Sequence, residues 1–272
     1  YSFLFHHQPN LINLGYIYYY GLGTVKDVLR AKFCLEKAIK NNNSQGLVNL
    51  GHIYFNEKNY SEAKKLYKLA AKKYNSFGYI YLALLYLKGL GVKKNYIKAE
   101  KFLELAAFEG NTDALYMLGL LYLLGNGVDV NYKKAKIYFE LSAKKNDVNS
   151  LYYLGFLFEN GKGVDLDIQN AIKYYKKCAE KGENDELIMC DYKLCESDQR
   201  NMNHYIANND LGLIYITELN FYNIELAKKY IKEAAMNEYP FGQNNYGLFS
   251  LYYLNTKENA IHFFKKAAKN QF

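Results

Sequence analysis

Two cysteines and a histidine lie near one another in the sequence and have side chains that could bind a metal ion. Four residues separate Cys190 from Cys195, and eight separate Cys195 from His204. Thiolate and imidazole groups are usual ligands of Zn²⁺, but these spacings match no standard zinc module and a fourth ligand is missing. In an oxidising compartment, a disulfide between Cys190 and Cys195 is the alternative. We expect no metal and no cofactor, and we interpret residues 183–206 as a surface insertion without a clear period.

The other reactive side chains show no catalytic arrangement. The sequence contains neither an HExxH motif nor a serine-containing G-x-S-x-G motif. Its recurring G-x-G pairs precede the expected start of a helix and follow no expected strand, so they do not match a nucleotide-binding loop. The five histidines are scattered along the chain: His6, His7, His52, His204 and His262. We therefore predict that the protein is not an enzyme and has no small-molecule substrate.

The composition is that of a folded protein with a large core. Of the 272 residues, 50% are hydrophobic and 23% are charged, which is far from the composition of a disordered chain. A membrane-spanning helix requires an apolar run of about 18 residues, and no such run exists in this sequence. Because the sequence begins with Tyr1 rather than methionine, we expect a fragment or a processed chain.

Small residues recur along the chain in two series that keep step with each other. The first series follows leucine in most units: Gly15, Gly51, Ala83, Gly119, Gly155, Gly212 and Gly247. The second series consists of alanines: Ala31, Ala63, Ala99, Ala135, Ala171, Ala227 and Ala260. Steps of 32 to 36 residues in the first series, interrupted by one step of 57, indicate a helical solenoid. Apolar residues at intervals of three and four in both halves of a unit predict two amphipathic helices per unit.

Each unit also carries signals for the ends of its helices. In the stretch LLGNGVDVNYKKA (residues 123–135), we expect Gly125 and Gly127 to take positive φ and end the first helix, while Val128 packs back into the core. Gly119 costs about 1 kcal/mol relative to alanine inside a helix, which is tolerable where it lets a neighbouring helix approach closely. Side chains able to cap the second helix stand four residues before each marker alanine: Asp27, Asn59, Asn95, Asn131, Asp167, Asn223 and Thr256.

The combined pattern A-x3-LG-x2-Y, followed by G-x-GV, a cap, KA and AA, resembles the Sel-1-like repeat, a relative of the tetratricopeptide repeat. Residues 114–143 match it almost throughout, whereas units two, six and seven lack the G-x-G loop. The resemblance implies an all-α, right-handed superhelical solenoid of about seven antiparallel helix pairs. Repeats one to five would occupy residues 1–182, the insertion residues 183–206, and repeats six and seven residues 207–272. The resemblance also implies a function as a protein-binding scaffold or adaptor.

One recurring role in that family is as the lumenal adaptor of a membrane ubiquitin ligase in endoplasmic-reticulum-associated degradation. Glycosylation sequons at Asn42 and Asn59 are compatible with the lumen of the endoplasmic reticulum, which we favour over the cytoplasm or the bacterial periplasm. A bacterial-type secreted or periplasmic repeat protein is the alternative.

Lysines on the second helices raise a further possibility. They include Lys64, Lys65 and Lys68, and the net charge of +8 suits an acidic partner as well as solubility. However, Arg30 and Arg200 are the only arginines, and arginine is the residue best suited to bidentate contacts with phosphate or guanine. We expect these lysines to lie on a solvated outer face, and a basic RNA-binding solenoid is the less favoured alternative.

If the units pack as tetratricopeptide repeats do, three positions of each first helix line an inner, concave face. These positions lie two before, and two and five after, the leucine of each leucine-glycine pair. They are mostly apolar or aromatic, so the face is either a groove for a polypeptide partner or buried core. The residues predicted to bind a partner are Tyr16, Tyr19, His52, Phe55, Leu84, Tyr116, Leu120, Leu123, Tyr152 and Phe156. By contrast, Leu118 and Tyr122 are expected to point between helices and to hold the stack together.

Overall fold

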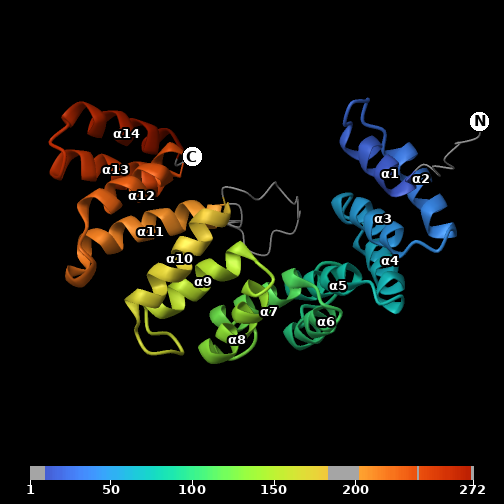
Figure 1. Ribbon diagram of the computed structural model, residues 1–272. Coiled ribbons are helices and arrows are strands. Elements are labelled where there is room, and N and C mark those ends of the chain that lie inside the picture. Colours follow the sequence, from blue (N-terminus) through green and yellow to red (C-terminus); the bar gives the residue numbers. More distant parts are fainter. Residues whose placement is uncertain (1–9, 183–201, 238, 271–272) are drawn as a thin grey trace, which may run out of the picture. The chain divides into compact units, whose positions relative to one another are not determined.

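A computed structural model of the chain describes residues 10–182, 202–237 and 239–270. These residues form helices joined by short loops, and no strand occurs among them. The fold is an all-α solenoid of helix pairs, as the sequence predicts. It divides into two compact units, Tyr1–Val130 and Asn131–Phe272, which are described one at a time below (Figure 1).

In the first unit, each helix packs against the next helix in the sequence, and α1 also touches α3. Its helices are α1 (Leu11–Tyr20), α2 (Val28–Lys40), α3 (Ser44–Asn56), α4 (Tyr60–Lys72), α5 (Ser76–Lys88), α6 (Tyr96–Phe108) and α7 (Thr112–Leu124). Odd-numbered helices are the first helices of the repeats and even-numbered helices are the second. The first helices of repeats one and two, α1 and α3, are therefore in contact with each other.

The second unit continues the same alternation, and α11 touches both α9 and α13. Its helices are α8 (Tyr132–Ala143), α9 (Val148–Glu159), α10 (Ile168–Gly182), α11 (Asn203–Thr217), α12 (Ile224–Met236), α13 (Pro240–Tyr252) and α14 (Lys257–Asn270), with a short 3-10 helix η2 (Leu219–Phe221). Within the described ranges of both units, no helix combines the length and the apolar character that crossing a bilayer requires.

The second helices begin where the sequence predicts, because most of the expected caps form. Six side chains accept a hydrogen bond from the backbone N–H three residues later, at 2.8 to 3.3 Å: Asp27, Asn59, Asn95, Asn131, Asp167 and Asn223. Thr256 differs, since its hydroxyl donates to the carbonyl of Ser250 at 3.2 Å. A second series of caps, which the sequence reading missed, starts the first helices: Asn10, Asn43, Asn75, Asn111 and Asp147.

The marker glycines make room for bulky side chains of the second helices. A Cβ atom on Gly51 would lie 2.6 Å from the ring of Tyr67, and one on Gly155 would lie 2.5 Å from the ring of Tyr175. In each case the bulky residue stands four positions after the marker alanine of the same unit. The close approach of a neighbouring helix that was predicted for Gly119 is therefore observed at Gly51 and Gly155.

The glycine loops turn the chain and also join consecutive repeats. Gly125 and Gly127 have φ of +66° and +78°, so both take the left-handed conformation predicted for them. Gly127 lies against the ring of Tyr96, where a Cβ would come within 1.9 Å of the ring. Two further pairs repeat this contact: Gly91 with Tyr60, and Gly163 with Tyr132. The tyrosine is always the first residue of the preceding repeat's second helix. Val128 is only half-buried.

Candidate functional site

The face predicted from the first helices is partly core. Four of its residues are buried, with exposed fractions of 3% to 8%: Leu84, Tyr116, Leu120 and Leu123. Side chains with so little exposed surface offer almost nothing to a partner, so the structure assigns these four to the core. The other six are partly or substantially exposed: Tyr16, Tyr19, His52, Phe55, Tyr152 and Phe156. The remaining candidates for binding are thus residues of α1 and α3 in the first unit and residues of α9 in the second unit.

In the first unit, α1 and α3 bring five rings together. We call this surface the α1/α3 face; it comprises Tyr16, Tyr19, Tyr20, His52 and Phe55. The ring centroids of Tyr16 and Tyr20 are 4.5 Å apart, and those of Tyr19 and Tyr20 are 4.9 Å apart. His52 and Phe55 are nearly parallel, with ring centroids 6.4 Å apart. Tyr16 is 38% exposed. Tyr20 was not predicted, although it stands beside Tyr19.

An amide links the two helices of this face. Asn56 Nδ2 donates a hydrogen bond to the hydroxyl of Tyr19 at 2.8 Å and lies 3.0 Å from Nε2 of His52. Tyr19 belongs to α1, whereas Asn56 and His52 lie one turn apart on α3. The hydrogen bond fixes the tyrosine ring relative to α3. The face is therefore a prearranged aromatic surface with polar atoms inside it.

In the second unit, the predicted residues Tyr152 and Phe156 lie on α9 beside charged groups. Lys162 Nζ stands 4.7 Å from the ring centroid of Phe156. The hydroxyl of Tyr152 donates to Oδ2 of Asp210, on α11, at 3.4 Å. The phenol of Tyr175, on α10, donates to Oε2 of Glu159 at 2.7 Å. This end of the predicted face therefore combines rings with two carboxylates.

Asp210 is an acidic group of this region whose pKa is raised by its surroundings. The pKa of its carboxyl is raised to about 7 in total: burial and the nearby charge of Glu159 raise it, while hydrogen bonds from Asn209 and Tyr152 lower it. In the described part of the chain, no ion pair neutralises Asp210. This residue was not predicted, because an aspartate on a helix is expected to be a solvated side chain.

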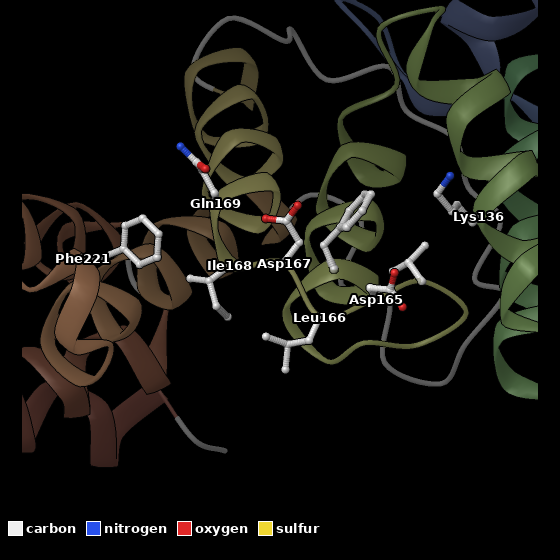
Figure 2. Close-up of a pocket in the computed structure, with 9 residues that line it drawn as sticks. Lys136, Asp165, Leu166, Asp167, Ile168, Gln169 and Phe221 are labelled. Atoms are coloured by element: carbon white, nitrogen blue, oxygen red, sulfur yellow. The ribbon is translucent and has the colours of Figure 1, made fainter.

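A depression in the second unit is a further feature that the sequence did not indicate. It has a volume of about 660 Å³. Figure 2 shows that Asp165, Leu166 and Asp167 come from the loop before α10, and that Phe221 of η2 stands opposite. The lining residues are Lys136, Phe158, Val164, Asp165, Leu166, Asp167, Ile168, Gln169 and Phe221.

The loss of the glycine loop in repeat six accounts for the depression. At the preceding repeat junctions a tyrosine at the start of the second helix packs against a loop glycine, but here Ile168 replaces the tyrosine and η2 replaces the loop. Two of its polar side chains already have partners. Asp167 binds the backbone and the side-chain amide of Asn170, and Lys136 pairs with Glu140 at 2.7 Å. The lining of the depression is mainly apolar, with Asp165 and Gln169 as its other polar residues.

The other chemistry considered from the sequence finds no support in the described ranges. No three His, Cys, Asp or Glu side chains gather there as a metal site. Cys34 and Cys178 are buried free thiols, and burial raises the pKa of both. His204 lies on α11, next to the ring of Tyr205. Cys190 and Cys195 fall outside the described residues.

Among solved structures, a Sel1 repeat protein from Oxalobacter formigenes is similar, with a TM-score of 0.67 and 27% identity over 84% of this chain and 86% of that chain. A protective antigen of uropathogenic Escherichia coli strains gives a TM-score of 0.48 and 21% identity, over 97% of this chain and 62% of that one. An immunity protein of Pseudomonas aeruginosa gives a TM-score of 0.48 and 23% identity, over 62% and 67%. A comparison with curated proteins finds no match.

The repeats themselves decide the family. The Sel1 repeat profile matches residues 11–43, 44–75, 76–111, 112–147, 148–183, 207–239 and 240–272. These matches contain the marker glycines and alanines, the glycine loops and all of the caps described above except Asn10. Because they cover most of the sequence, the chain belongs to the Sel1 repeat family.

Proposed function

We propose that this chain is a non-enzymatic scaffold that binds a polypeptide partner, and that the α1/α3 face holds part of that partner. Sel1 repeat proteins are generally scaffolds for protein-protein interaction and generally lack enzymatic activity. The observation that carries the proposal is the group of partly exposed rings held in place by Asn56. Aromatic side chains are enriched at the energetic centres of protein interfaces, and a fixed ring loses little conformational entropy on binding.

The origin of the similar solved protein bears on the cellular setting. Oxalobacter formigenes is a bacterium. This favours the bacterial-type alternative over an adaptor in endoplasmic-reticulum-associated degradation. The α1/α3 face does not depend on the setting, because its rings and its amide belong to the chain itself.

Selection of peptides from a random display library on the immobilised protein tests the proposal. Tyr16→Ser combined with Phe55→Ser removes two rings from the face. We expect the selected peptides to lose most of their affinity for this variant, because the apolar area that they bury is gone.

A matched control removes exposed apolar side chains elsewhere in the first unit. Leu29 and Tyr74 are 80% and 72% exposed and do not belong to the α1/α3 face. Leu29→Ser combined with Tyr74→Ser should leave peptide binding unchanged. Melting curves of both variants show whether they remain folded. Equal binding by the parent and by the folded Tyr16/Phe55 variant would disprove the role of this face.

A further inference from the structure

Two exposed lysines flank the α1/α3 face. Lys26 stands in the loop after α1, with its Nζ 5.3 Å from the ring centroid of Tyr19. Lys58 follows α3, and its backbone N–H donates to the carbonyl of Phe55 at 2.9 Å. The two lysines therefore border the part of the face that is held together by Asn56.

The acidic residues next to these lysines are already neutralised. Asp27 caps α2 and pairs with Arg30 at 3.2 Å. Glu57 pairs with Lys32 at 2.7 Å. Within the described residues, neither Lys26 nor Lys58 forms an ion pair. Both ammonium groups remain available to carboxylates from outside the chain.

The charge of the whole first unit has the same sign. The formal net charge is +8, and nearly all of the excess lies in residues 1–130, while the second unit is almost balanced. An approaching acidic chain is attracted toward the first unit over a distance of about 10 Å at moderate salt. Lys26 and Lys58, and the positive charge of the first unit as a whole, thus both favour an acidic partner.

We propose that the α1/α3 face binds an acidic polypeptide segment, whose apolar side chains cover the rings and whose carboxylates reach Lys26 and Lys58. This inference rests on the proposed function and adds the chemical class of the partner. It differs from binding a nucleic acid strand, because bases stack on open ring faces. Here the tyrosine rings stand at steep angles, 50° between Tyr16 and Tyr20 and 84° between Tyr19 and Tyr20, so they form no series of parallel faces on which successive bases could stack.

Fluorescence anisotropy with labelled polymers tests the charge preference. The probes are a random copolymer of glutamate and tyrosine, a random copolymer of lysine and tyrosine, and oligouridylate. We expect the glutamate copolymer to bind most tightly, with an affinity that falls as salt rises. The test variant is Lys26→Glu combined with Lys58→Glu, and we expect it to bind the glutamate copolymer roughly tenfold more weakly or worse at low salt.

The control variant has the same net charge as the test variant. Lys68 and Lys72 are exposed on α4, away from the rings, and Lys68→Glu combined with Lys72→Glu should weaken binding much less. Any one of four results would overturn the proposal. The two variants could weaken binding equally, or the lysine copolymer could bind as tightly as the glutamate copolymer. The protein could also prefer oligouridylate or fail to bind the glutamate copolymer. In all of these cases, library peptides that still require Tyr16 and Phe55 would leave the proposed function standing. If the library peptides no longer required Tyr16 and Phe55, both the proposed function and this inference would be refuted.

Discussion

Replacing Asp210 with asparagine should stabilise the protein at neutral and alkaline pH. The carboxyl is largely buried among α9, α10 and α11, and its pKa is raised from 3.8 to about 7 by burial and by Glu159. The folded state therefore holds the proton more tightly than the unfolded state does. Stability from this group is complete below pH 4, is lost as the pH rises toward 7, and is absent above it.

The magnitude follows from the size of the pKa change. A rise from 3.8 to about 7 corresponds to about 4 kcal/mol between the folded and unfolded states. Asparagine keeps an oxygen that can accept the hydrogen bond from Tyr152, and it carries no charge. We expect Asp210→Asn to raise the free energy of unfolding by about 2 to 4 kcal/mol at pH 8 and by much less at pH 5.

Urea unfolding followed by circular dichroism at pH 5 and pH 8 measures this difference. Asp165→Asn is the control, because Asp165 is an exposed loop carboxylate whose substitution should change stability by less than about 0.5 kcal/mol. If Asp210→Asn lowered stability at pH 8, or changed it equally at both pH values, the argument from burial of an unpaired carboxyl would be refuted.

Four further substitutions test the packing of the repeats by thermal or urea unfolding. Asn131→Ala removes a helix cap and should cost about 1 kcal/mol; unchanged stability would contradict the capping role. Gly155→Ala places a Cβ 2.5 Å from the ring of Tyr175 and should cost about 1 to 3 kcal/mol. Helix propensity alone would make this variant more stable, and that result would show that the ring moves aside freely. Tyr116→Ala and Leu118→Ala should each cost about 2 to 5 kcal/mol, since both side chains are buried, whereas a negligible loss for Tyr116→Ala would return that residue to the binding face.

Features that depend on a few neighbouring residues were predictable from the sequence. A cap such as Asn131 is satisfied by a backbone N–H three residues later, and the left-handed turn at Gly125 and Gly127 needs only the missing Cβ atoms. The same holds for Gly51, because its partner Tyr67 stands at a fixed offset in the same repeat. The repeating spacing of these residues therefore determined the helix boundaries, the turns and the helix-pair solenoid.

The candidate site needed the tertiary structure, because burial depends on every element that surrounds a side chain. Tyr16 and Leu120 occupy equivalent positions of their repeats, two residues after the leucine of the leucine-glycine pair, yet one is 38% exposed and the other 7%. The sequence treats them alike, since their local patterns are the same. Asp210 likewise reads as a solvated helix residue until α9 and α10 enclose it and Glu159 approaches. Periodicity therefore determined which residues share a face, whereas the packing of neighbouring helices decided which parts of that face reach solvent.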